Sequence, residues 1–120
     1  MPTNCVFCDI AAGRAPAAIV RRWSQALAIV PLSPVTPGHL LVLPYEHVTD
    51  AGSDPLLSAL TMAAASELVA ELPSANILTS KGRPATQSTD HLHLHVLPRC
   101  ADDGLVLPWS LPLCIHADTV

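Results

Sequence analysis

The chain has 120 residues, of which 50% are hydrophobic and 13% are charged, so it is long enough for one compact domain and too apolar to be disordered. Its net charge is −4, and its six Lys and Arg residues cannot form the extended basic surface that nucleic acids or acidic membranes require. We expect one domain over residues 1–120. Because neither a secretory leader nor an apolar run of about 18–20 residues is visible, we expect this domain to be located in the cytoplasm.

The first half of the chain predicts short elements separated by proline and glycine. Residues Phe7–Gly13 have the pattern of a short helix closed by glycine. Two short strands are expected at Ile19–Arg22 and Ala26–Val30, on either side of a turn. A buried strand is expected at Leu40–Leu43, because this continuous apolar run follows a proline-rich stretch and is closed by another proline.

The second half predicts one long helix and two further strands. A helix over Pro55–Leu72 is indicated by Asp54 as its N-cap and by Pro73, which stops it. A strand is expected at Asn76–Thr79, and strict alternation over His91–Leu97 predicts another. Five short strands, a short N-terminal helix and one long helix favour an α+β domain with a mainly antiparallel five-stranded sheet.

Three histidines alternate with leucines in the last predicted strand. His91, His93 and His95 therefore share one face, and the leucines between them face a core. Neighbouring histidines are about 6.5–7 Å apart and the outer two about 13 Å. Because zinc binds ring nitrogens at about 2 Å, one ion cannot bind all three, and we expect them to have different roles. The alternative is a solvent-facing histidine stripe without a function.

The cysteines suggest a metal site rather than disulfides. Cys5 and Cys8 have the Cys-x2-Cys spacing that is typical of a metal or redox pair in a reducing compartment. With His47 and one end of the histidine series they would complete a closed tetrahedral site of two sulfurs and two nitrogens, which favours a structural role. Cys100 and Cys114 lack such spacing and are expected to be free thiols.

Together these residues resemble the histidine-triad (HIT) family of nucleotide hydrolases and transferases. The motifs lie in the family's order between residues 5 and 109, in the stretches Cys5–Ile10, Pro34–Pro44 with His47 following, and Gln87–Arg99. The resemblance implies a HIT-like fold and a homodimer that extends one sheet through both protomers. It also suggests that Trp109 reaches the partner's active site, whereas the role of the tail, residues 110–120, stays open.

The resemblance further implies a covalent mechanism. His93 would attack the α-phosphorus of a nucleotide and form a nucleotidyl-histidine intermediate that water then hydrolyses. One nitrogen of the His93 ring must then be free, so the other should donate to a backbone carbonyl or a neighbour. His95 would contact the phosphate oxygens, with Gln87 and Ser88 as further donors. His39 is either a satisfied core histidine or a residue that orients another imidazole, and we group it with the catalytic residues.

The metal site and the substrate pocket also follow from the resemblance. It assigns a structural Zn²⁺ to Cys5, Cys8, His47 and His91. Ile29 and Leu32 align with apolar residues around the base. Two positions depart from the family: Pro31 stands where a ribose-binding Asp or Asn is usual, and Ser80 stands where an Asn or Gln near the leaving group is common. The phosphate chemistry is therefore expected to be intact, and nucleoside recognition to be altered.

Several functions fit this reading. The first is hydrolysis of nucleoside 5′-phosphoramidates or related nucleotidyl anhydrides through His93. A nucleotidyl transferase would share the covalent intermediate and differ only in its acceptor. A catalytically weak module that binds nucleotide and zinc is a further alternative, as is a zinc-tied structural protein with incidental histidines. The base, the leaving group and the physiological substrate are left open by the sequence.

Overall fold

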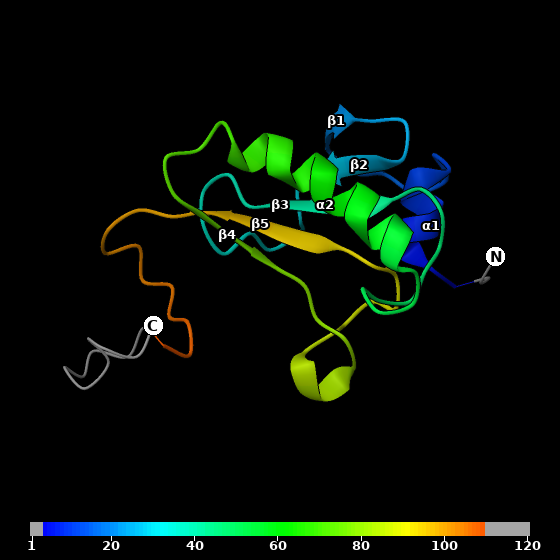
Figure 1. Ribbon diagram of the computed structural model, residues 1–120. Coiled ribbons are helices and arrows are strands. Elements are labelled where there is room, and N and C mark those ends of the chain that lie inside the picture. Colours follow the sequence, from blue (N-terminus) through cyan, green and yellow to red (C-terminus); the bar gives the residue numbers. More distant parts are fainter. Residues whose placement is uncertain (1–3, 110–120) are drawn as a thin grey trace.

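The computed structural model describes residues 4–109, and within them one antiparallel sheet is covered by helices (Figure 1). The elements in chain order are α1 (Val6–Ala11), β1 (Ile19–Arg22), β2 (Ala26–Ile29), β3 (Leu40–Pro44), α2 (Pro55–Val69), β4 (Ala75–Leu78), the 3-10 helix η1 (Arg83–Ala85) and β5 (Leu94–Pro98). The strands of this described part lie in the order β1-β2-β3-β5-β4, and each neighbouring pair is antiparallel. The predicted α+β class and five-stranded sheet are confirmed.

One face of the sheet packs against α2. Val42 in β3 lies opposite Ala28 in β2 and Leu94 in β5, so these three side chains form a row across the sheet. They belong to a buried cluster that includes Ala64 and Leu68 of α2. The green ribbon of α2 crosses the central strands in Figure 1, and small residues on both sides allow this close packing.

The opposite face of the sheet carries α1 and the histidines. Ile29, Leu41 and His95 form the equivalent row, because Leu41 lies opposite both of the others. Ile29 and Leu41 pack in a second buried cluster with Phe7 and Ile10 of α1. The period-2 pattern of the strands thus separates a purely apolar face from one that also presents imidazole rings.

Helix α2 begins where the sequence predicts and ends earlier. The Asp54 carboxylate caps it by accepting a hydrogen bond of 3.1 Å from the Leu57 amide. The predicted end is Leu72, but the last regular residue is Val69. The Leu72 amide bonds instead to the Val69 carbonyl at 3.0 Å, so the chain tightens into a turn before Pro73. No helix of residues 4–109 is long and apolar enough to cross a membrane.

The last strand starts three residues later than predicted. His91 and His93 lie in an extended segment ahead of β5, which begins at Leu94. The ladder to β3 is interrupted here because the His91 ring, rather than a backbone amide, contacts the Pro44 carbonyl at 3.0 Å. The alternation itself persists, since Leu92 and Leu94 are buried on the α2 side.

Candidate functional site

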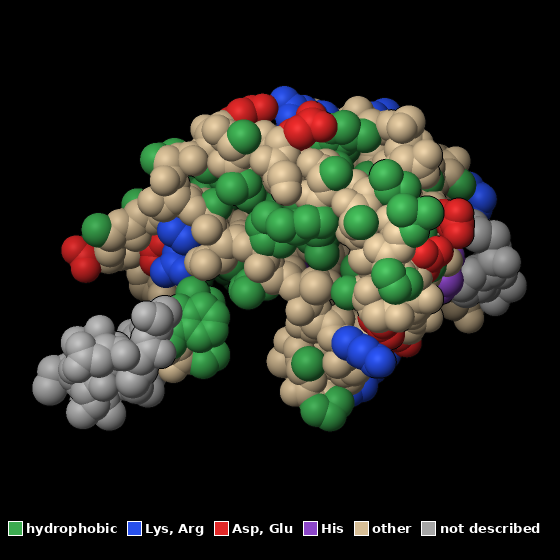
Figure 2. Space-filling model, viewed as in Figure 1, with side chains coloured by type: hydrophobic (Ala, Val, Ile, Leu, Met, Phe, Trp, Pro, Cys, Tyr) green, Lys and Arg blue, Asp and Glu red, His purple; other side chains and the backbone are tan. Residues whose placement is uncertain are grey.

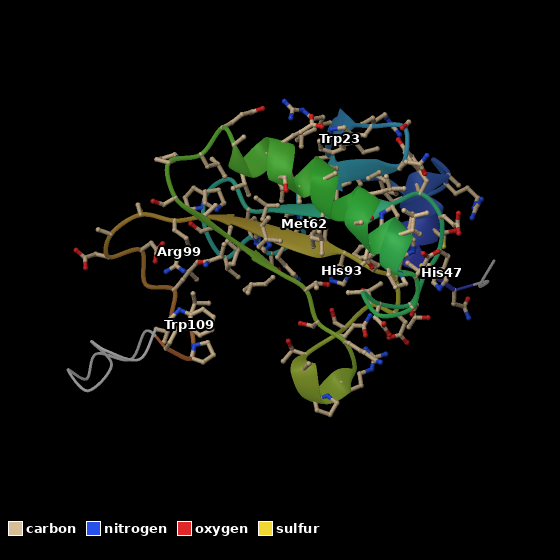
Figure 3. The ribbon with its side chains drawn as sticks, viewed as in Figure 1. Trp23, His47, Met62, His93, Arg99 and Trp109 are labelled. Carbon is tan, nitrogen blue, oxygen red and sulfur yellow. The ribbon has the colours of Figure 1, made fainter. Side chains whose placement is uncertain are left out.

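Two cysteines and two histidines from three segments converge beside α1. They are Cys5, Cys8, His47 and His91, and their ligand atoms all lie within 4.8 Å of one another. The Nδ1 atoms of His47 and His91 are 3.2 Å apart. Cys8 Sγ is 3.3 Å from Nδ1 of His47 and 3.6 Å from Nδ1 of His91, and Cys5 Sγ is 3.4 Å from Nδ1 of His91. Figure 3 shows His47 on the α1 side of the molecule.

These distances can be tested against zinc coordination. Zinc binds sulfur at about 2.3 Å and imidazole nitrogen at about 2.0–2.1 Å, so the edges of a regular tetrahedron are about 3.3 Å between nitrogens and about 3.5 Å between nitrogen and sulfur. Four of the six separations within the group, those given above, agree with these edges to within about 0.2 Å. Nε2 of His91 donates to the Pro44 carbonyl, which leaves the Nδ1 lone pair directed into the group. The four residues therefore fit a zinc ion.

Burial keeps the side chains of Cys8 and His91 uncharged near pH 7. Burial, together with the neighbouring Cys5 thiol, raises the pKa of Cys8 to about 11. Burial lowers the pKa of His91 to about 4, so its ring is neutral near pH 7. A neutral imidazole is ready to bind a metal, and a buried thiol loses its proton when a metal ion replaces it. The backbone amide of Cys8 also donates to Cys5 Sγ at 3.3 Å, which fixes the position of this sulfur at the start of α1.

His93 has the hydrogen bond expected of a nucleophile. Its Nδ1 donates to the carbonyl oxygen of His91 at 2.8 Å, so Nε2 carries a free lone pair. The ring is 9% exposed and packs edge-to-face against Phe7, with ring centroids 5.0 Å apart. Figure 3 shows His93 at the start of β5. The predicted pairing of one ring nitrogen with a backbone carbonyl is confirmed.

A short hydrogen-bond chain fixes the tautomer of His95. The Val35 amide donates to Nδ1 of His39 at 3.1 Å, so His39 carries its proton on Nε2. That nitrogen donates to Nδ1 of His95 at 3.0 Å, which leaves the His95 proton on Nε2. Burial lowers the pKa of His95 to about 4 and, by the same effect, lowers the pKa of His39. His95 is therefore a neutral donor, 5.2 Å from the His93 ring between centroids.

Gln87 is buried and its amide holds the loop between β4 and β5. Its Oε1 accepts from the Gly82 amide at 2.8 Å. Its Nε2 donates to the backbone carbonyls of Thr49 at 2.7 Å and Thr89 at 3.2 Å. These bonds tie the loop to the segment after β3. The proposed role of Gln87 as a phosphate donor would thus require its amide to exchange one of these partners.

The two predicted serines do not line the apolar cleft beside α1, and no hydrogen bond joins either side chain to a histidine ring within residues 4–109. Ser88 is exposed and lines a polar cleft of about 680 Å³ together with Cys5, His47 and Arg83. Ser80 is half-buried in the loop that follows β4. Trp109 is half exposed at the end of the described residues, and the predicted tail and Cys114 lie outside them. Cys100 is a free, exposed thiol, as predicted.

An apolar cleft of about 490 Å³ adjoins the histidines. Ile29 and Leu32, which the sequence assigns to a base pocket, both line it. Leu41 forms part of its floor and lies opposite His95 in the β3–β5 ladder. Phe7 lines the same cleft and touches the His93 ring. The cleft is therefore placed to hold the group attached to a phosphate that binds at the histidine rings.

Two positioning groups were missed by the sequence analysis. The Thr79 hydroxyl donates to the backbone carbonyl of His93 at 2.8 Å and links the end of β4 to the segment that carries His93. The Val35 amide orients His39 through its backbone. A hydroxyl at the end of a strand next to the triad is a weak sequence signal for such a role, and a backbone donor gives no signal.

Comparison with known proteins identifies the family. The sequence pattern of the HIT domain matches residues 12–102. The chain belongs to the HIT domain family. An uncharacterized HIT-like protein from Mycobacterium tuberculosis is 40% identical over 108 residues, covering 84% of this chain and 75% of that protein. The adenosine 5′-monophosphoramidase hnt1 of Schizosaccharomyces pombe is 31% identical over 121 residues, covering 92% of this chain and 86% of that protein.

Solved structures of HIT proteins agree with the fold and bear on the metal. A Zn-bound histidine triad family protein from Mycobacterium smegmatis has a TM-score of 0.76 and 34% sequence identity, over 87% of this chain and 81% of that one. This HIT domain has its own group of two cysteines and two histidines with tetrahedral spacing. The predicted zinc site is therefore supported by both its geometry and a zinc-containing relative.

Proposed function

We propose that this HIT protein hydrolyses nucleoside 5′-phosphoramidates or related nucleotidyl anhydrides through a nucleotidyl-His93 intermediate. The observation that carries the proposal is the bond from Nδ1 of His93 to the His91 carbonyl, which leaves Nε2 available to attack phosphorus. Two relatives, from Schizosaccharomyces pombe and Saccharomyces cerevisiae, are named adenosine 5′-monophosphoramidases, which supports this substrate class.

The proposed reaction has two displacements at phosphorus. Nε2 of His93 forms a bond to the α-phosphorus, and the bond from phosphorus to the leaving amine breaks. The amine departs with the bonding electron pair and takes a proton from solvent. Nε2–H of His95 donates to a phosphate oxygen as negative charge accumulates there, while His39 holds His95 in the required tautomer. Water then attacks the phosphorus and loses a proton to solvent, while the bond from phosphorus to Nε2 breaks and its electron pair returns to Nε2. This step releases the nucleoside monophosphate and restores the free His93 ring.

The zinc ion is proposed to be structural. Cys5, Cys8, His47 and His91 would hold it, and four protein ligands leave no open coordination position. The ion would neutralise the two thiolates. Because the ligands come from α1, from the segment after β3 and from the segment before β5, the bound site ties α1 to the sheet.

A nucleotide- and zinc-binding module of low turnover is the second candidate. Two observations favour it: the His93 ring is only 9% exposed, and the Gln87 amide is occupied by three backbone partners. A nucleotidyl transferase would use the same His93 intermediate and pass the nucleotide to an acceptor other than water. Product analysis distinguishes the transferase from the hydrolase.

We further propose that the protein is a homodimer in the cytoplasm with the sheet continued across the interface. Within residues 4–109, β4 is an edge strand with one unpaired side. Leu78, at the end of this strand, is 37% exposed, and Met62 on α2 is 43% exposed. Figure 2 shows hydrophobic side chains gathered on this face. Exposed apolar side chains beside a free strand edge are typical of a surface that pairs with another copy.

The test is release of AMP from adenosine 5′-phosphoramidate. We expect His93→Ala to lower kcat at least 1000-fold, and His95→Asn to slow the reaction while still forming the covalent adduct, because only the first removes the nucleophile. Mass spectrometry of the acid-quenched protein detects the adduct, and zinc content and circular dichroism check the fold. A folded His93→Ala protein with the wild-type rate would falsify the mechanism. A zinc-loaded wild type that binds AMP without turnover would favour the binding module.

A further inference from the structure

The apolar cleft beside the histidines has almost no groups that could recognise a sugar. Of the twelve described residues that line it, eleven have no polar side-chain atom, and Thr89 is the exception. At Val30 and Pro31, the first two residues of the wall that follows β2, the backbone has no free donor either. The Val30 amide already donates to the Ala18 carbonyl at 2.9 Å, and Pro31 has no N–H.

The position of the cleft determines which part of a substrate would meet this wall. Ile29, Leu41 and His95 form one row across three strands, and neighbouring strands are about 4.8 Å apart. The cleft floor at Ile29 is therefore about 10 Å from the backbone of His95. When the phosphate of a nucleotide is at His95 and its nucleoside enters the cleft, the sugar lies between His95 and Ile29. It then lies against the apolar lining.

The chemistry of this lining predicts how the cleft discriminates between sugars with and without hydroxyls. A site built to hydrogen-bond a hydroxyl rejects the analogue that lacks it by about 10⁴-fold or more, because its own polar groups are left unpaired. The eleven apolar side chains of this lining leave no polar atom unpaired, so they gain nothing from a hydroxyl. A substrate without sugar hydroxyls then loses no interaction with the protein.

Resting on the proposed hydrolase function, we infer that this cleft is indifferent to the 2′- and 3′-hydroxyls of the sugar. Phosphoramidates of 2′-deoxy- and 2′,3′-dideoxynucleosides are then substrates about as good as those of ribonucleosides. Pro31, half-buried on the cleft wall, is one of the residues responsible, since it presents neither a polar side chain nor an N–H.

The first experiment compares kcat/KM for adenosine 5′-phosphoramidate with that for its 2′-deoxy and 2′,3′-dideoxy forms. We expect the ribose form to be favoured by no more than about threefold over either analogue. A preference of tenfold or more for ribose would overturn the inference. Thr89→Val is made alongside, because Thr89 has the one polar side chain of the lining. A fall in ribose preference in that variant would show a hydroxyl contact and would also count against it.

Calorimetry separates this inference from the hydrolase proposal. The dissociation constants of AMP and 2′,3′-dideoxy-AMP are measured on zinc-loaded wild type. Equal constants support the inference even if none of the phosphoramidates is turned over, in which case only the hydrolase function fails. A dissociation constant at least tenfold lower for AMP overturns the inference whatever the turnover. Failure of both nucleotides to bind overturns it as well, since the cleft then does not take a nucleoside.

A gain-of-function variant tests the role of the lining itself. Pro31→Asp adds an acceptor on the cleft wall outside the strand ladders, and we expect it to shift the ratio of kcat/KM toward the ribose form by at least tenfold. Val20→Asp is the matched control, because Val20 is 53% exposed on β1, does not line the cleft and would carry the same charge. An identical ratio in both variants would contradict the role assigned to Pro31.

Discussion

Removing the metal should strongly destabilise the protein. The site joins Cys5 to His91, which are 86 residues apart in the sequence, as well as Cys8 to His47. A cross-link closing a loop of this length restricts the unfolded chain by about 4.5 kcal/mol in the chain-entropy estimate used for disulfides. Zinc at about 1000 times its dissociation constant gives a similar value, about 4 kcal/mol.

This free energy converts into a large shift of the melting temperature. The unfolding entropy of a 120-residue protein is about 0.25 kcal/mol/K, from about 2.1 cal/mol/K per residue. A loss of about 4–4.5 kcal/mol therefore lowers Tm by about 16–18 °C. The thermodynamic argument is the same for chelation and for removal of a ligand, because both abolish the cross-link between distant segments.

The assay is scanning calorimetry of the zinc-loaded protein, of the protein after chelation, and of Cys8→Ser, with zinc measured by elemental analysis. Cys100→Ser is the matched control, since Cys100 is an exposed free thiol outside the group. We expect one zinc per chain in the wild type and in Cys100→Ser, with equal Tm. A chelated protein that melts within about 3 °C of the loaded one would refute the reasoning, because the ligands would then be held in place without the ion.

Three further results are expected. His39→Phe should lower kcat about 100-fold with little change in KM, because His95 loses its hydrogen-bond donor. His39→Gln retains a donor and should recover part of the rate. Steady-state kinetics check both variants. The pKa of His95 is lowered to about 4 in the folded state against about 6.5 in the unfolded chain, so the unfolded state binds more protons between these values. The free energy of unfolding should thus fall by about 2 kcal/mol as pH drops from 6.5 to 4, because solvent screening of the half-buried ring limits the effect. Urea titrations at several pH values should show a smaller pH dependence in His95→Gln than in the wild type. Thr79→Val should cost about 1 kcal/mol of stability in urea, because one hydrogen bond to the His93 carbonyl is lost; no change would contradict its positioning role.

The fold was largely predictable because its signals are local. The strand at Ile19–Arg22 matches the predicted bounds, and Asp54 caps α2 as expected. The differences arise where tertiary contacts override the pattern. The alternation over His91–Leu97 is real, but β5 starts at Leu94 because a side chain occupies the Pro44 carbonyl. Periodicity reports which face a residue occupies and not which backbone groups are paired.

The site was predictable for its metal group and less so for its substrate side. The spacing of Cys5 and Cys8 and the family's motif order indicated the four residues that the structure brings together. The engagement of the Gln87 amide could not be predicted, because its partners come from two loops brought together only by folding. The same holds for the Val35 amide that orients His39. Such contacts depend on tertiary geometry rather than on residue type.

His91 connects the two halves of the site. Its ring takes part in the metal group through Nδ1 and donates to Pro44 through Nε2. Its backbone carbonyl accepts the hydrogen bond that fixes the tautomer of His93. His91 therefore belongs to the metal group that ties α1 to the sheet and also orients the ring of the proposed nucleophile. The alternation of the sequence makes this possible, because residues two apart share a face, so the ring of His93 lies within reach of the carbonyl of His91.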